Sequence, residues 1–463
     1  MTTDYSLVNR SEYTGKVFAP VFPGIYATYK MDKLAFSFGF NPIGGGGGGT
    51  FEDGLPSFEY PLTGLLAAPG VSGYRADINF EGQSVYFGYQ ANISYQINDM
   101  ISIAVGGRFT MAKEKYNGYM RNIELNMGGD WFLATNVFSD LATQAGNGLA
   151  SLNGAVASMQ PLFDANFGDM TFAELEGDGR IDATTRAQLE GGLLAVGQSQ
   201  AAIDDMTLTE ARFVYVVAAT IVEDQYDQAR TTAIITQDQE VEYEKTATGI
   251  TPVISLDIKP SDKLNIAIKY EHITKLEFEN NTTKDFMVGY DLDAGDSLTM
   301  FPNGAKSQYD IPGNLTVGAT FYPTDKIMLS TGFHYFMDKQ ADWEGRQDSL
   351  KSNSFEMAFG AEYALTDDLK ASVGWMISRP NPTGGFQTDL SQSMPSNSWG
   401  FGFAYQLSPI IELNVAGQYS LYQTSERTFG YPGESPAVLI TETYKKPIWI
   451  AAVGLNFNFG ADK

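Results

Sequence analysis

The chain has 463 residues with 48 glycines, 13% aromatic residues, no cysteine and a formal net charge of −25. The acidic balance argues against a nucleic-acid partner, because phosphate binding needs clustered Lys and Arg. The lack of cysteine excludes disulfides and thiolate metal sites. Two histidines and no Gly-x-Ser-x-Gly motif leave little material for a metal cluster or a serine hydrolase. We therefore expect no enzyme activity, no metal and no cofactor.

The chain contains no run of 18 apolar residues, so the sequence predicts no transmembrane helix. Only a closed barrel of strands then satisfies the backbone of a chain that crosses lipid. Residues 1–16 lack the apolar core of a signal peptide. Because an exported protein needs such a peptide, we expect the sequence to be a processed form or to be incomplete at its N-terminus.

Apolar and polar residues alternate along many segments of the chain. From Ser84 to Ile97 every odd position is apolar, and the even positions are mainly Ser, Gly, Gln and Asn. The same alternation returns at 399–407, 411–421 and 449–459. Successive side chains of a strand point to opposite faces, so each segment has one apolar face and one small or polar face. The small and polar face suits a lumen better than a charged aqueous exterior.

The turns between these segments share a form. Five short polar turns follow an aromatic residue, at Tyr29–Lys33, Tyr95–Asp99, Tyr322–Lys326, Tyr363–Asp367 and Tyr405–Pro409, and a sixth, Ile258–Lys263, lacks the tyrosine. The opposite connections are long, as at 44–83, 280–310 and 379–397. Short turns beside an aromatic girdle on one side and long loops on the other are typical of outer-membrane barrels.

These signals predict an all-β chain that forms a transmembrane antiparallel β-barrel. Bacterial barrels normally close with an even number of strands. We therefore expect about 14 strands, of which 13 are clear and residues 4–12 are remains of another. Residues 1–463 are expected to form one barrel of the cell outer membrane, crossing it many times and contacting its lipid and lipopolysaccharide. The clear strands span 17–30, 33–42, 84–97, 101–115, 238–258, 263–279, 311–322, 327–338, 352–365, 369–379, 397–407, 410–424 and 442–459.

Residues 124–236 interrupt the alternation and are expected to form an extracellular, largely helical insertion. Between Glu124 and Arg230 there are 16 acidic and 4 basic residues. Apolar residues, Phe132 and Phe138 among them, follow helical spacing, and shorter helices are predicted at 171–175 and 183–196. Either these helices bury their apolar faces on one another, or they leave a groove that receives an apolar ligand. Phe132 and Phe138 are ligand-binding candidates for the second case.

The joint between the two shorter helices has some features of an EF-hand calcium loop. Glu174, however, stands at position 1, where Asp is usual, and Thr185 stands at position 12, where a bidentate Glu is needed. A helix–turn–helix with a solvated acidic corner is the better interpretation. Calcium binding at 174–185 stays open.

Three stretches carry a resemblance to a known family. Residues 20–42 (PVFPGIYATYKMDKLAFSFGFNP), 248–270 and 310–322 resemble strands and turns of the outer-membrane long-chain fatty-acid and aromatic-hydrocarbon transporters of the FadL/TodX type. Residues 171–197 are similar to the family's extracellular helical loop. The resemblance spans nearly the whole chain through short, degenerate motifs. It implies a 14-stranded barrel with an N-terminal hatch, although the hatch has no counterpart ahead of Met1.

The same resemblance implies a kink in the third strand, through which a hydrophobic ligand leaves sideways into the membrane. In this sequence that strand ends in Asn41, Pro42 and Gly44, followed by five more glycines. Proline removes a backbone donor and glycine invites bends, so we expect strand pairing to fail there. A lateral opening at these three residues and a flexible extracellular loop are the alternatives.

Two basic residues lie on faces predicted to point into the lumen. Arg108 shares its face with Ser102, Ala104 and Thr110, and Lys269 shares its face with Glu271. A fatty-acid carboxylate in an apolar lumen would be held by such groups, so Arg108 and Lys269 are ligand-binding candidates. The alternative is an internal ion-pair network that braces the lumen.

Together these features favour passive outer-membrane transport of hydrophobic small molecules, such as long-chain fatty acids, through the lumen with lateral exit near strand 3. A general diffusion porin is one alternative. Another is a structural or adhesive surface barrel that binds a protein partner through its extracellular loops. The sequence does not name the ligand, because apolar pockets discriminate chain lengths weakly.

Overall fold

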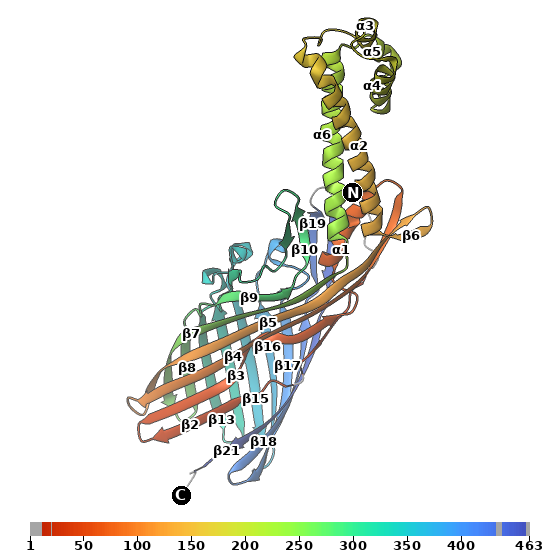
Figure 1. The fold of residues 1–463 in the computed structure, drawn as a ribbon. Coiled ribbons are helices and arrows are strands. Elements are labelled where there is room, and N and C mark those ends of the chain that lie inside the picture. Colours follow the sequence, from red (N-terminus) through yellow and green to blue (C-terminus); the bar gives the residue numbers. More distant parts are fainter. Residues whose placement is uncertain (1–11, 20, 432–437, 460–463) are drawn as a thin grey trace.

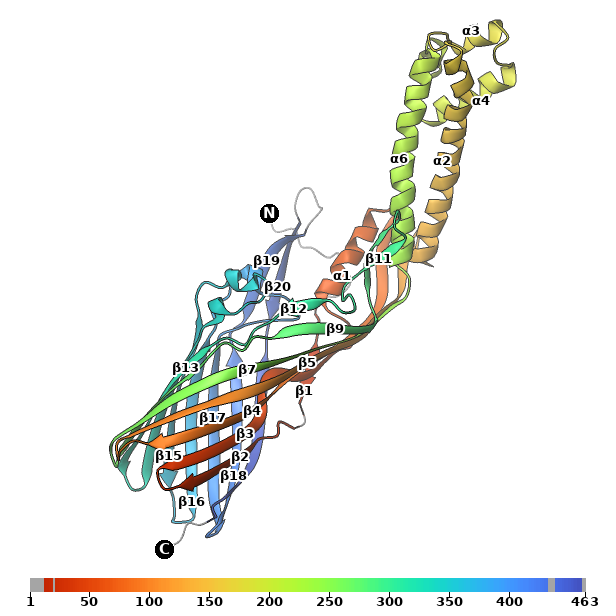
Figure 2. The ribbon, with the colours of Figure 1, turned by 60° about the vertical axis from the view of Figure 1, so that its left-hand side comes forward.

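The computed structural model consists of a barrel-shaped wall of long strands and a helical stalk that rises from one end of it (Figure 1). It describes residues 12–19, 21–431 and 438–459. The predicted segment 4–12 therefore lies almost wholly outside the described residues. Figure 2 shows the wall as a single curved layer, with the stalk, residues 134–235, projecting beyond the strand ends.

The wall belongs to a 17-stranded sheet, and the strand pairs described in it are antiparallel. Thirteen of its strands pair in one continuous order, mostly with their neighbours in sequence, and β2 and β21 stand at the two edges of that order. They are β2 (Ile25–Met31), β3 (Leu34–Phe51), β4 (Val71–Gln96), β5 (Ile101–Met127), β7 (Gln239–Ser261), β8 (Leu264–Glu271), β13 (Asn314–Thr324), β14 (Ile327–Phe336), β15 (Ser354–Ala364), β16 (Leu369–Arg379), β17 (Ser396–Ser408), β18 (Ile411–Tyr422) and β21 (Pro447–Phe457). The predicted antiparallel barrel fold is confirmed, and each clear predicted strand has a counterpart.

Shorter elements lie at the stalk end of the wall. The strands are β1 (Gly15–Phe18), β6 (Asp130–Leu133), β9 (Glu277–Lys284), β12 (Lys306–Gln308) and the hairpins β10 (Met287–Asp291) with β11 (Asp296–Thr299) and β19 (Ser425–Tyr431) with β20 (Val438–Tyr444). Helix α1 (Pro56–Thr63) lies between β3 and β4, and single 3₁₀ turns occur at Gly64–Ala67, Asp338–Gln340, Arg346–Ser349 and Gly384–Phe386. The prediction of a long loop over 44–83 is thus wrong. Strands β3 and β4 extend into this range from both sides, and α1 lies between them.

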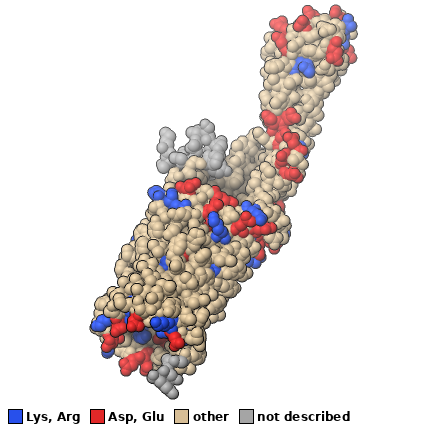
Figure 3. All heavy atoms as spheres, turned by 90° about the vertical axis from the view of Figure 1, so that its left-hand side faces the viewer, with Lys and Arg blue, Asp and Glu red and all other residues tan. Residues whose placement is uncertain are grey.

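The wall has an apolar outer face and a small, polar inner face. On β17, Trp399, Phe401 and Phe403 are exposed, whereas Ser398 on the other face is buried and lies 2.6 Å from the Ser420 hydroxyl. Figure 3 shows the same division, with charged residues gathered at the two ends of the wall and an uncharged belt between them. The tyrosines that precede the short turns, Tyr29, Tyr95, Tyr322, Tyr363 and Tyr405, are all exposed at the end opposite the stalk. An apolar belt with an aromatic rim is the surface that a barrel presents to lipid.

Two long antiparallel helices make the stalk. Helix α2 (Ala134–Asp164) and helix α6 (Leu208–Ile235) pack along their length, and α3 (Phe172–Gly177), α4 (Ala183–Ala195) and α5 (Gln200–Asp204) form the tip (Figure 1). The upper part encloses a core that includes Met159, Leu175, Leu193 and Tyr215. Helices are therefore present in the predicted insertion 124–236, whereas its first ten residues form the end of β5, a turn and β6. In the described part of the chain no helix is long and apolar enough to span a membrane.

Acidic side chains at the corner between α3 and α4 are bound by neighbouring groups of the stalk itself. Glu174 forms a capping box with Thr171, Asp182 accepts a hydrogen bond of 2.7 Å from the Thr185 N–H, and Glu176 pairs with Arg186 at 2.9 Å. These contacts satisfy the first turns of α3 and α4, whose N–H groups have no partner within their own helix. The helix–turn–helix interpretation accounts for Glu174, Glu176 and Asp182, and no group of metal-ligating side chains is found among the described residues.

The tip contains two capping boxes, Thr171 with Glu174 at the start of α3 and Thr207 with Glu210 at the start of α6. Both make the stability of the tip sensitive to acid. Hydrogen bonds from the Thr171 and Thr207 backbones lower the pKa values of Glu174 and Glu210 below the ordinary 4.5. The stabilisation is therefore complete above pH 4.5 and is lost as the pH falls through the lowered values. We therefore expect the helices to melt at a lower temperature when the pH is below 4.5. Circular dichroism of the protein in detergent measures this melting temperature.

The Glu174→Gln/Glu210→Gln variant should lose that pH dependence, because glutamine keeps the reciprocal bond without titrating. The Glu223→Gln/Asp224→Asn variant removes two exposed acids of α6 outside the caps and serves as its control. Equal pH profiles for the capping variant and the wild type would contradict the assignment.

Candidate functional site

A buried cluster of charges lies on the inner face of β5, β7 and β8. The Arg108 guanidinium and the Lys269 ammonium both contact Glu271, at 2.8 Å and 2.7 Å. Arg108 and Glu271 are buried, whereas the Lys269 side chain is 37% exposed. The structure thus brings together the two basic residues singled out in the sequence, as the ion-pair alternative describes. Two cations against one carboxylate leave one positive charge in excess.

The cluster also holds polar atoms without a partner. Arg108 Nε and Thr110 Oγ1 are buried, and neither has a hydrogen-bond partner among the described residues. Unpaired buried polar groups of this kind destabilise a fold by roughly 1–3 kcal/mol each.

Next to this charged cluster, further along β5 toward the stalk, lies an apolar patch that we name the lumen cluster. It consists of buried Tyr86, Ala112, Ala247, Leu276 and Phe278, with Ile43, Tyr309 and Ile311 packed against them. A second ion pair, Lys245 with Glu114 at 3.0 Å, borders it, and the Tyr86 hydroxyl donates to the same carboxylate at 2.5 Å. This second pair is neutral overall. The excess charge therefore stays with Lys269 and Arg108.

Strand β3 connects the lumen cluster with the edge of the wall. Its pairing with β4 continues to Phe51 but shifts register between Pro42 and Gly44 and again between Gly44 and Gly47. The intervening Ile43 turns inward over Gly88, where a Cβ added to Gly88 would meet Ile43 at 2.7 Å and Arg108 at 3.0 Å. The irregularity therefore places a β3 side chain beside the charged cluster.

On its other edge β3 has an interruption. It pairs with β2 from Leu34 to Phe40 and with β1 from Gly48 to Phe51. Between them, residues 41–47 have no strand partner on that side among the described residues. The expected failure of pairing at Asn41, Pro42 and Gly44 is therefore found on the β1/β2 edge only, because bulges preserve the ladder to β4.

The two aromatic candidates lie elsewhere. Phe138 is buried at the base of the stalk in a core with Leu125, Ala233 and Tyr243, and Phe132 on β6 is 48% exposed. Neither belongs to the lumen cluster. The structure does not bring them together with Arg108 and Lys269, so their part in ligand binding stays a prediction.

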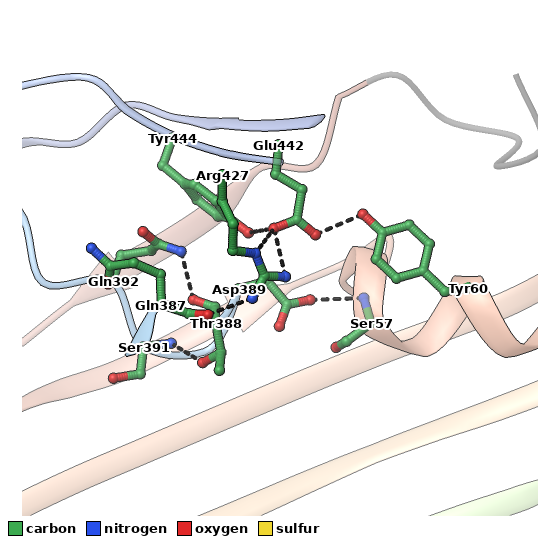
Figure 4. Close-up of polar contacts among 10 residues, drawn as sticks. All are labelled: Ser57, Tyr60, Gln387, Thr388, Asp389, Ser391, Gln392, Arg427, Glu442 and Tyr444. Carbon is green, nitrogen blue, oxygen red and sulfur yellow. Dashed lines mark hydrogen bonds and ion pairs between the residues drawn. The ribbon is translucent and has the colours of Figure 1, made fainter. Parts of the chain in front are cut away.

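A polar network that the sequence did not indicate ties the loops at the mouth. Figure 4 shows Glu442 of β20 accepting hydrogen bonds from Tyr60 of α1, at 2.6 Å, from Tyr444, and from Arg427 of β19. The Arg427 guanidinium also donates to the Gln387 carbonyl, and the Ser57 N–H donates to Asp389 at 2.7 Å. These contacts join segments more than 300 residues apart, so no local pattern could have revealed them.

The curved antiparallel wall, its apolar outer face and its short-turn end together define an outer-membrane β-barrel with a polar lumen. No protein-family model and no curated protein matches the sequence. Solved structures similar to this chain include a FadL homologue from Pseudomonas aeruginosa, with 11% identity over 94% of this chain and 78% of the other and a TM-score of 0.49. The toluene transporter TodX from Pseudomonas putida is 11% identical over 95% of this chain and 82% of its own, with a TM-score of 0.45. The monoaromatic hydrocarbon channel CymD is 10% identical over 96% of this chain and 86% of its own, with a TM-score of 0.43.

The glycine run gives a test of the β3 irregularity. Gly45 has a φ of +85°, and a Cβ there would lie 2.2 Å from the Ser84 carbonyl oxygen, whereas a Cβ on Gly46 meets nothing within 4 Å. Gly45→Ala should therefore destabilise the barrel by about 1–3 kcal/mol, and Gly46→Ala should have little effect. Heat-dependent mobility on denaturing gels measures the loss of the folded barrel. Equal melting of the two variants would contradict the observed bulge.

Proposed function

We propose that the protein carries hydrophobic small molecules passively across the outer membrane, with the stalk on the extracellular side. The observation that carries this proposal is the position of Ile43. It stands in the irregular part of β3, packs against the lumen cluster and lies near Arg108 on the two sides of Gly88, and the stretch 41–47 to which it belongs lacks a strand partner on one edge among the described residues. A binding surface and an interruption of the wall therefore adjoin.

The lumen site suits a ligand with an apolar body and an anionic head. The partly buried Ile43, Tyr309 and Ile311 of the lumen cluster offer apolar contacts, and Lys269 is accessible and belongs to a group with one excess positive charge. A carboxylate there would accept charge-assisted hydrogen bonds in surroundings from which water is largely removed. Long-chain fatty acids are the substrate class that this combination favours.

Lateral exit is the second part of the proposal. A ligand in the lumen cluster would have to displace Ile43 to reach residues 41–47. In lipid, unpaired backbone groups are costly, so an interruption of the ladder at this depth needs a compensating use. Passage of an apolar ligand into the membrane provides one.

A general diffusion porin remains the competing function, since inward-facing groups such as Glu362, Lys370 and Glu412 make part of the inner face charged. Such a barrel would conduct ions steadily in planar bilayers and would show no saturable binding of long-chain acids. Bilayer conductance and acid binding therefore separate the two functions.

Lys269→Gln tests the head-group site. It should weaken binding of a fluorescent long-chain fatty acid by roughly tenfold, the effect of one charge-assisted hydrogen bond of about 1.4 kcal/mol. The binding of the matching long-chain alcohol should not change. Lys269 is the better position than Arg108, because removing Arg108 would leave a buried carboxylate short of a partner, at a cost of about 3–5 kcal/mol.

Lys370→Gln is the control for this measurement, since Lys370 faces Glu362 and Glu412 on another part of the inner wall. An equal loss for acid and alcohol, or an equal loss in both variants, would contradict a specific head-group site at Lys269.

Ile43→Ala tests the exit. The smaller side chain should speed transfer of a preloaded fatty acid from the barrel into the bilayer of proteoliposomes, because less of the path is filled. Ile311→Ala removes the same volume from the lumen cluster outside β3 and should leave the transfer rate nearly unchanged. Equal rates in the two variants would show that general packing of the cluster, and not the β3 interruption, controls release.

A further inference from the structure

Helix α6 carries an apolar surface that the stalk itself does not use. Ala211, Tyr215 and Ala219 are buried in the core that α6 shares with α2 and the tip helices. A second row, which we name the α6 stripe, consists of Phe213, Val216, Val217 and Ile221, exposed by 69%, 40%, 41% and 55%. The spacing of three to four residues places these side chains along one line of the helix. The helix is thus apolar on two of its faces.

The partner helix shows that this exposure is not a general property of the stalk. The outward positions of α2 are hydrophilic: Asn136, Ser139, Asp140, Thr143, Asn147 and Ser151. Both helices stand in the same environment and pack on one another. The α6 stripe therefore needs an explanation of its own, since contiguous exposed apolar surface usually marks an interaction site.

A hollow continues the stripe toward the tip. It has a volume of about 580 Å³ and lies between α5 and the start of α6, with Ala202, Met206, Phe213 and Val214 as apolar lining and Asp205 and Glu210 as acidic lining. Phe213 belongs to both the stripe and the hollow. The two form one continuous surface about as long as a short helix.

This surface lies far from the lumen. Phe213 precedes the end of α6 at Ile235 by 22 residues, which correspond to roughly 33 Å of helix. The stalk points away from the mouth of the wall (Figures 1 and 2). A ligand held here would not be in contact with Lys269 or the lumen cluster.

The charges around the stripe define what would cover it. Asp205 and Glu210 stand at its upper end, and Glu223 and Asp224 stand at its lower end. Figure 3 shows acidic residues at the tip and near the base of the stalk with an uncharged length between them.

The arginines of the stalk contact other side chains of the stalk, and none of them forms an ion pair with the four acids around the stripe in the described part of the chain. Arg180, Arg212 and Arg230 lie over Phe167, Phe163 and Tyr226, and Arg186 pairs with Glu176 and Glu190. A second copy of the stripe would bring like charges together at both ends. A partner with basic residues flanking an apolar face would complement both features.

We propose that the α6 stripe docks a basic amphipathic helix of a partner protein outside the cell. The helix would lay its apolar face along Phe213, Val217 and Ile221, seat one large side chain in the hollow, and place Lys or Arg beside the acids at each end. This is helix-in-groove recognition with electrostatic steering.

The test uses the full chain in detergent and a synthetic helix of leucine and lysine in heptad spacing as the probe. The wild type should bind this peptide, and Phe213→Ser/Val217→Ser/Ile221→Ser should raise the Kd at least roughly tenfold. The control Asn136→Ser/Asn147→Ser/Asn153→Ser, on the outward face of α2, should stay within about twofold. Glu223→Gln/Asp224→Asn should weaken binding and reduce its salt dependence.

Three outcomes would overturn the proposal. Unchanged affinity in the triple serine variant would show that the peptide binds by charge alone. Equal binding of a peptide with glutamate in place of lysine would remove the case for a basic partner. Dimers in sedimentation that disappear in the triple serine variant would assign the stripe to a second copy of this chain. Circular dichroism of each variant confirms that the stalk remains folded, which is expected since all substituted side chains are exposed.

Discussion

The backbone hydrogen-bond ladder is the constraint on which the rest of the structure depends. In the hydrocarbon region no water replaces a missing partner, so each strand must pair with its neighbours. Among the described residues, eleven of the thirteen wall strands pair along both sides, with β2 and β21 at the two edges, and the inner face is left to small and polar side chains. The stretch 41–47 of β3 departs from it on one edge, and it adjoins the buried charges. The proposed lateral exit rests on this departure.

The fold could be predicted largely because membrane strands obey a simple rule. Alternation fixed the faces of β4 and β17, and the tyrosine before each short turn marked the end of a strand. The interior of 44–83 could not be predicted, because a run of glycines has no side chains that could alternate: β3 continues through six glycines, and β4 begins 13 residues before its alternation becomes clear at Ser84. Helix α1 is short and contains Pro61, so its periodicity is weak.

The candidate site was only partly accessible to the same reasoning. The inward faces of β5 and β8 follow from alternation, which is why Arg108 and Lys269 were found in the sequence. Their shared partner depends on β7 standing between the two strands, and that order is a property of the whole sheet. Phe132 and Phe138 were selected by helical spacing alone, which does not distinguish a core position from a binding position. The mouth network around Glu442 depends on loops whose approach no local pattern encodes.

The attachment of the stalk has a mechanical consequence. Helix α2 follows the short strand β6, which folds back antiparallel on β5, and α6 leads into β7, so the stalk is joined to two adjacent strands of the wall. A force on the tip would therefore reach the wall through two strands that pair with one another. Because β5 and β7 pair from Ile101 to Met120, many hydrogen bonds would share this load. The stalk is thus attached to one of the longest ladders of the wall and not to an isolated loop.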